Sequence, residues 1–195
     1  MTDLRHLACS EAVVPCPSGC YGQPQANVLH GREACIQCNS PAFGDLVAMI
    51  GCAASGKSSA LRTVPPHQIV SLDTLRAIVS EPGDQAATAD AVLLQHHVLL
   101  NRARRGATTY VDNTSVEAQH RLQLVELAHQ HGRRAVAVLV DAPLHLCLAR
   151  NAARPDHQRV PEDVLRWQHR MARSAHALLP REGWDEIRHH PSTGH

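Results

Sequence analysis

The sequence predicts an α/β fold, with a parallel sheet of about five strands and helices on both of its faces. Three observations support this prediction. Apolar runs of strand length alternate with helical patterns from residue 46 to residue 189. The first run, 46–50, leads into a glycine-rich turn. The run at 135–140, AVAVLV, is apolar throughout, as expected for a strand buried on both sides.

Composition limits the classes of protein to consider. The chain has 195 residues, of which 44% are hydrophobic, and its net charge is +1. This charge excludes a broadly basic protein that coats duplexes, so any contact with nucleic acid must be local. No apolar run approaches the roughly 20 residues that span a bilayer, and the beginning of the chain lacks a signal-peptide pattern. We therefore expect no membrane partner and a cytoplasmic location.

Residues 1–42 differ from the rest and are expected to form a separate small segment ahead of a domain at 43–195. Five of the seven cysteines lie here. Two short cysteine pairs could hold a structural Zn²⁺ ion with four thiolates, and this metal would supply the folding energy of so short a segment. The proposed ligands are Cys16, Cys20, Cys35 and Cys38, with Cys9 and His30 in reserve. The alternative is a flexible tail with free thiols. The sequence does not indicate which partner this segment binds.

The strand at 46–50 is followed by Gly51-x-x-x-x-Gly56-Lys57-Ser58, a complete phosphate-binding loop. This motif refines the prediction to a P-loop NTPase/kinase fold. Its glycines let backbone N–H groups point at phosphate oxygens, Lys57 reaches the β- and γ-phosphates, and Ser58 ligates Mg²⁺. Lys57 is the only lysine in the chain, so the Asn-Lys-x-Asp motif of guanine-reading GTPases cannot be present.

The other elements follow from period and turn signals. Expected strands are 67–72, 107–112 and 184–189, and expected helices are 59–63, 73–80, 86–105, 114–131, 143–153 and one from 161 onward. A capping box, Thr114 to Glu117, is expected to open the fourth helix. The core stripe expected in the 86–105 helix is Val92, Leu93, Leu99, Leu100 and Ala103. For the last helix it is Val164, Trp167, Met171 and Leu178.

Two acidic residues are expected at the edge of the sheet where the phosphate loop opens. Asp73 comes directly after the second strand, and Arg76 lies three residues further along the same helix face. A carboxylate there could accept the proton of an attacking hydroxyl while the arginine binds a phosphate of the acceptor. The alternative is an N-cap aspartate with a local ion pair. Asp112 could orient the Mg²⁺ shell through water, or cap the next helix.

Arg150 and Arg154 lie four residues apart, next to a polar segment with Pro155 and Arg159. Arginines on a mobile lid commonly neutralise a transferring phosphoryl group. The spacing alone also fits two solvated surface residues.

From residue 46 to about residue 188 the sequence resembles the 5′-hydroxyl polynucleotide kinase module of bacterial polynucleotide kinase-phosphatases, within the small P-loop kinases. The segments that carry the resemblance are GCAASGKS, IVSLDTLRAIVSEPGDQAAT, YVDNTSVEA and LARNAARPDHQRVPEDVLRWQH. Ala54 stands where the family usually has glycine. The resemblance implies that ATP and Mg²⁺ bind at Gly51, Cys52, Ala53, Ala54, Ser55, Gly56, Lys57, Ser58 and Ser59.

The resemblance also implies residue roles. Asp73 is the general base on the 5′-OH, Arg76 contacts the acceptor's phosphate, and Arg150 with Arg154 reaches the donor phosphates. We therefore expect an ATP- and Mg²⁺-dependent kinase acting on the 5′-OH end of RNA or DNA. Two alternatives remain: a kinase of the same fold acting on a small hydroxylated metabolite, nucleoside or antibiotic, and a nucleotide-binding regulatory or adaptor module.

Overall fold

The computed structural model describes residues 25–27, 32–34 and 44–191, and the chain divides into two compact units, Met1–Phe43 and Gly44–His195. In the first unit, β1 (Gln25–Asn27) pairs antiparallel with β2 (Arg32–Ala34). The proposed zinc ligands all lie outside the described residues: Cys16, Cys20, Cys35 and Cys38, with Cys9 and His30 in reserve. The zinc site therefore stays a prediction.

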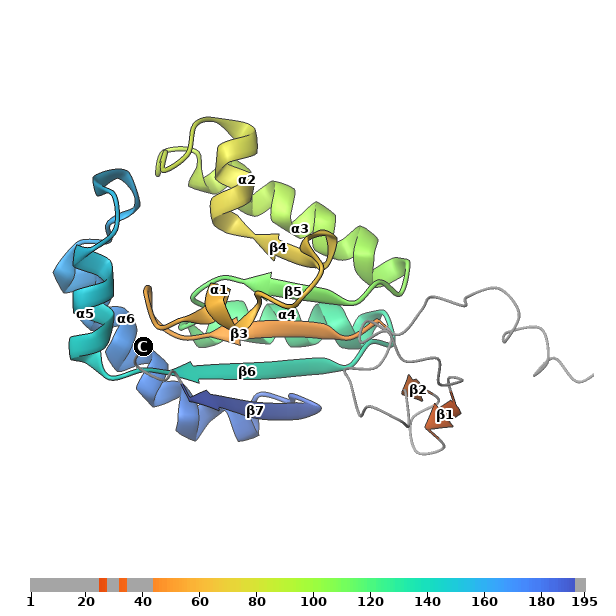
Figure 1. The fold of residues 1–195 in the computed structure, drawn as a ribbon. Helices are drawn as coiled ribbons and strands as arrows, with labels where there is room; N and C mark the ends of the chain where they lie inside the picture. Colours follow the sequence, from red (N-terminus) through yellow and green to blue (C-terminus); the bar gives the residue numbers. More distant parts are fainter. Residues whose placement is uncertain (1–24, 28–31, 35–43, 192–195) are drawn as a thin grey trace, which may run out of the picture. The chain divides into compact units, whose positions relative to one another are not determined.

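The second unit contains a five-stranded parallel sheet, as the alternating pattern predicts. Its strands are β3 (Leu46–Ile50), β4 (Ile69–Ser71), β5 (Thr109–Asp112), β6 (Ala135–Asp141) and β7 (Glu186–Pro191). Their order across the sheet is β4-β5-β3-β6-β7, and all four neighbouring pairs are parallel (Figure 1). The first strand in sequence is thus the central one, flanked by β5 and β6.

Helices cover both faces of this sheet, but unequally. The α-helices are α1 (Lys57–Ala60), α2 (Leu72–Val79), α3 (Thr88–Arg104), α4 (Ala118–Gln130), α5 (Leu144–Ala152) and α6 (Glu162–Leu178). Short 3₁₀ turns lie at Pro66–Gln68, Asp156–Gln158 and Leu179–Arg181. One face packs against α2, α3, α4 and α6, whereas the other carries α1 and the turn after it (Figure 1). Among the described residues, no helix is long and apolar enough to cross a membrane.

The strand register explains where a site can form. Ser71 at the end of β4 pairs with Asp112 at the end of β5, and Ala48 of β3 pairs with Val111. The carboxyl ends of three adjacent strands therefore meet at one edge of the sheet. At the central strand β3 the chain first crosses to the side of β4 and β5, and later to the side of β6 and β7. Open α/β sheets bind their ligands at such a point.

The predicted core stripes of two helices are partly wrong. In α3, Val92 and Leu93 are exposed, whereas Leu99 and Ala103 are buried as expected, with Ala91 and Gln95. In α6, the buried residues are Leu165 and Ala175; Val164, Trp167 and Leu178 are more than a third exposed, and Met171 is half-buried. Small alanines face the neighbouring elements here, and they carry too weak an apolar signal to mark the buried side.

The predicted capping box at Thr114–Glu117 is also wrong. The structure places Glu117 at the N-cap position of α4, with no side-chain cap. Thr114 instead accepts a hydrogen bond at its backbone oxygen from Gly51 N, at 2.9 Å. Ser115 adopts a positive φ of 45°. The β5–α4 connection is therefore shaped by contact with the phosphate loop rather than by local capping.

Candidate active site

The phosphate loop links β3 to α1 and depends on two glycines. A Cβ atom at Gly51 would lie 2.7 Å from the Val140 oxygen, so no larger residue fits there. Gly56 has φ 107°, a conformation that favours glycine. Ala54 also has a positive φ, of 59°, although it has a side chain. Ala54, which stands where the family usually has glycine, thus adopts a backbone conformation that favours glycine.

Lys57 lies across its own loop. Its Nζ donates to the carbonyl oxygens of Gly51 (2.9 Å) and Cys52 (2.7 Å), and only 8% of the residue is exposed. Burial lowers the pKa of Lys57 to about 8, and the nearby Asp112 carboxylate opposes this shift. The ammonium group is thus held at the mouth of the loop by neutral acceptors, which a phosphate could replace.

The structure brings Ser58 and Asp112 into direct contact. The Ser58 hydroxyl donates to Asp112 Oδ2 at 2.8 Å, although 54 residues separate them in sequence. A hydroxyl and a carboxylate are hard oxygen ligands of the kind that Mg²⁺ prefers. The alternative in which Asp112 caps the next helix is not what the structure shows, because α4 begins only at Ala118.

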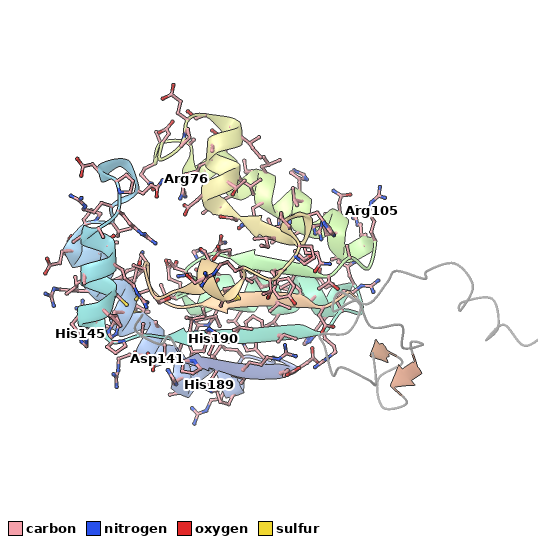
Figure 2. The ribbon with its side chains drawn as sticks, viewed as in Figure 1. Arg76, Arg105, Asp141, His145, His189 and His190 are labelled. Atoms are coloured by element: carbon pink, nitrogen blue, oxygen red, sulfur yellow. The ribbon has the colours of Figure 1, made fainter. Side chains whose placement is uncertain are left out.

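Asp73 and Arg76 lie on α2 at the same edge. Their side chains form an ion pair, in which Arg76 Nη2 donates to Asp73 Oδ1. The Asp73 side chain is 85% exposed and that of Arg76 only 11%. Burial lowers the pKa of Arg76 from its ordinary value. Figure 2 shows Arg76 on the side of α2 that faces the end of α5. Asp73 therefore forms the local ion pair and also lies at the edge of the sheet where ligands bind.

The segment 153–160, named the lid here, follows α5. At its base, Asn151 bonds to both the nitrogen (3.1 Å) and the oxygen (2.7 Å) of Val160. Arg150 Nη1 lies 3.4 Å from the carbonyl oxygens of Ala54 and Ser55, so this side chain touches the phosphate loop. Arg154 lies close enough for its charge to oppose the protonation of Lys57. Both arginines therefore act on the phosphate loop, whereas their contact with donor phosphates stays a prediction.

Sequence reasoning missed three residues that shape this site. Asn113 Oδ1 accepts from Leu72 N and from Gln95 Nε2, each at 3.2 Å, and thereby ties the start of α2 to the end of β5. Gln168 of α6 accepts from the Ala53 backbone nitrogen at 2.9 Å. No local pattern marks such pairs, because the partners are far apart in sequence.

A family model described as an AAA domain matches residues 46–178. The chain belongs to this AAA domain family. The match includes the phosphate loop, Asp73, Arg76 and Asp112, and it ends with α6. A search of curated proteins found no match.

Solved structures share the fold of this AAA domain at low identity. A "putative kinase" from Chloroflexus aurantiacus J-10-fl is 14% identical, with a TM-score of 0.54, and the match covers 77% of this chain and 89% of that one. A chain of the AvrRxo1-ORF1:-ORF2 complex is 18% identical, with a TM-score of 0.57 and coverage of 73% and 54%; this chain thus spans about half of it. A chain of the PezAT toxin–antitoxin system of Streptococcus pneumoniae is 14% identical, with a TM-score of 0.51 and coverage of 76% and 67%.

The residues of this AAA domain fit a bound nucleotide with Mg²⁺. Lys57 is a buried cation among neutral acceptors, the oxygens of Ser58 and Asp112 meet, and Ser55 Oγ lies buried in the loop with no hydrogen-bond partner. The described residues contain no group of three or more His, Cys, Asp or Glu side chains that could hold a metal ion, and the cysteines proposed to bind zinc lie outside them.

Proposed function

We propose that the protein is an ATP- and Mg²⁺-dependent kinase that phosphorylates the 5′-OH end of a nucleic acid. The observation that carries this proposal is the position of Asp73. It lies two residues beyond Ser71, whose strand partner is Asp112, and Asp112 in turn contacts Ser58 of the phosphate loop. A carboxylate is thus held at the edge where the terminal phosphate of a bound nucleotide would lie.

In the proposed reaction, the acceptor hydroxyl oxygen attacks the γ-phosphorus of ATP, and the bond to the β-phosphate oxygen breaks to release ADP. Asp73 accepts the hydroxyl proton, which contributes about 10²–10⁴-fold to the rate. Lys57 and Arg150 neutralise charge on the phosphate oxygens. Ser58 and Asp112 are the residues that would hold Mg²⁺, whose positive charge stabilises the transferring phosphoryl group.

The acceptor assignment rests on Arg76. Its guanidinium is largely buried, it lies next to Asp73, and it lies on the side of α2 that faces the nucleotide edge (Figure 2). A phosphate on the acceptor would give this cation a second anionic partner, beside Asp73 and close to the reacting hydroxyl. The net charge of +1 fits an enzyme that binds one strand end rather than the length of a duplex.

The test uses ATP labelled on the γ-phosphate, with an oligonucleotide that ends in 5′-OH and a matched one that ends in 5′-phosphate. We expect label only on the 5′-OH oligonucleotide, and a loss of at least about 100-fold in rate for Asp73→Asn. Asp90→Asn removes an exposed carboxylate of α3 and serves as the matched control. Label on a nucleoside or other small hydroxylated compound, with none on the oligonucleotide, would move the assignment to a small-molecule kinase. Nucleotide binding without turnover would favour an adaptor.

We also propose that Cys16, Cys20, Cys35 and Cys38 hold one structural Zn²⁺ ion. The support is their pairwise spacing and the small size of the segment that contains them. Metal analysis of the purified protein should find about one equivalent of zinc, with a fourfold cysteine-to-serine variant at these positions as the control. A zinc content below about half an equivalent would contradict this assignment.

A further inference from the structure

Two cysteines outside the zinc motif meet inside the kinase-like domain. Cys52 belongs to the phosphate loop and Cys147 to α5, 95 residues further along the chain. Their sulfur atoms lie 3.4 Å apart, with the Cys52 thiol donating to Cys147 Sγ. Both residues are buried, with exposed fractions of 2% and 0%. The proposed phosphoryl transfer uses neither thiol.

The surroundings of this pair join the loop to the lid. Cys52 and Cys147 pack in one apolar cluster with Ala142 and Leu165. The Cys52 carbonyl oxygen accepts the Lys57 ammonium at 2.7 Å. One turn after Cys147, Arg150 contacts the carbonyl oxygens of the same loop. A covalent link between the two sulfurs would therefore join the loop that holds Lys57 to the helix that carries the lid.

We propose that Cys52 and Cys147 form an oxidisable dithiol site, at which a hydroperoxide converts the two thiols to a disulfide that fixes the phosphate loop to α5. The sulfurs need to approach by little more than 1 Å, since a disulfide bond is about 2.05 Å long. We expect rotation of the two cysteine side chains to supply this movement.

The chemistry takes two steps. The Cys147 thiolate attacks one oxygen of hydrogen peroxide, the O–O bond breaks, and a sulfenic acid forms while the leaving hydroxide takes up a proton and departs as water. Cys52 then attacks that sulfur, and its proton leaves with the sulfenic oxygen as a second water. The hydrogen bond from Cys52 lowers the pKa of Cys147, and the charges of Arg150 and Lys57 add to this effect. Cys147 is therefore the attacking group and Cys52 the resolving one.

The disulfide should inhibit turnover. A kinase lid must open and close during each cycle, and the link ties the helix that carries the lid to the nucleotide-binding loop. This consequence rests on the proposed function, whereas formation of the bond does not. We expect oxidation to lower kcat about tenfold or more, and a thiol reductant to restore it.

The experiment treats fully reduced protein with hydrogen peroxide and maps the sulfur bonds by mass spectrometry. Cleavage before aspartate and after lysine or arginine gives peptides 45–57 and 141–150, each with a single cysteine, which separates Cys52 from the cysteines of residues 1–42. The expected result is a linked pair of these peptides that disappears on reduction. Cys147 that becomes only singly oxidised, or that links to a cysteine of residues 1–42, would overturn the proposal.

Cys147→Ala is the control variant, because its side chain has no part in the proposed phosphoryl transfer. The reduced variant should turn over like the parent protein and should keep its activity in peroxide. If the parent protein and Cys147→Ala lose activity equally, the pair is not the sensitive site. Protein that labels no acceptor can still give the linked peptides, so failure of the kinase assignment and failure of the dithiol site are distinguishable.

Discussion

At the scale of single residues, Lys57 is the most informative side chain. It is buried, its ammonium donates to two carbonyl oxygens of its own loop, and its pKa is lowered to about 8 from 10.5. Between these two values the unfolded chain binds more protons than the folded one, so this residue makes the fold more stable as the pH rises through that window. Below pH 8 the full cost of burying the charge is present.

The same shift predicts how nucleotide affinity depends on pH. We expect affinity to fall above about pH 8, by up to tenfold per pH unit, because neutral Lys57 binds phosphate poorly. Binding above that pH should take up close to one proton. Calorimetry in two buffers of different ionisation heat measures both quantities.

The control for this pH prediction is Lys57→Arg, whose guanidinium stays charged across the range. Its nucleotide affinity should vary less with pH than that of the parent protein. An affinity of the parent protein that is constant to about pH 9.5 would show that Lys57 does not control the binding.

At the scale of elements, the β5–α4 connection joins several parts of the site. Arg121 of α4 is fully buried, bonds twice to Glu182 (2.5 and 2.8 Å) and donates to the backbone oxygens of Ser115 and Val116. The connection it holds also receives the Gly51 amide at Thr114. A buried ion pair thus supports a loop that contacts the nucleotide-binding backbone.

Arg121→Met should lower the free energy of unfolding by about 3–5 kcal/mol, because it leaves the buried Glu182 carboxylate without its cation. Unfolding in denaturant measures this loss. The double variant Arg121→Met with Glu182→Leu should lose less, since no buried charge stays unpaired. A single variant within about 1 kcal/mol of the parent would mean that water reaches Glu182 and replaces the arginine.

At the scale of the whole molecule, sequence reasoning recovers what depends on local patterns. The alternation of strands and helices predicts the parallel sheet. Because Asp73 comes just after a strand, and parallel strands end at the same edge, its position at that edge of the sheet is also predictable. The buried faces of α3 and α6 are less predictable, since they depend on which elements pack there. Trp167 is 38% exposed while Ala175 is fully buried. Contacts such as Asn113 with Gln95 require the folded chain.

The shielding of Lys57 has a practical consequence for labelling experiments. It bears the sole ε-amino group of the sequence, and its carbonyl partners and burial protect that group from solvent. Acylating reagents should therefore react at the amino terminus long before they reach the side chain. The time course of acylation at this one lysine would report how often the phosphate loop opens. No engineered reporter group is needed.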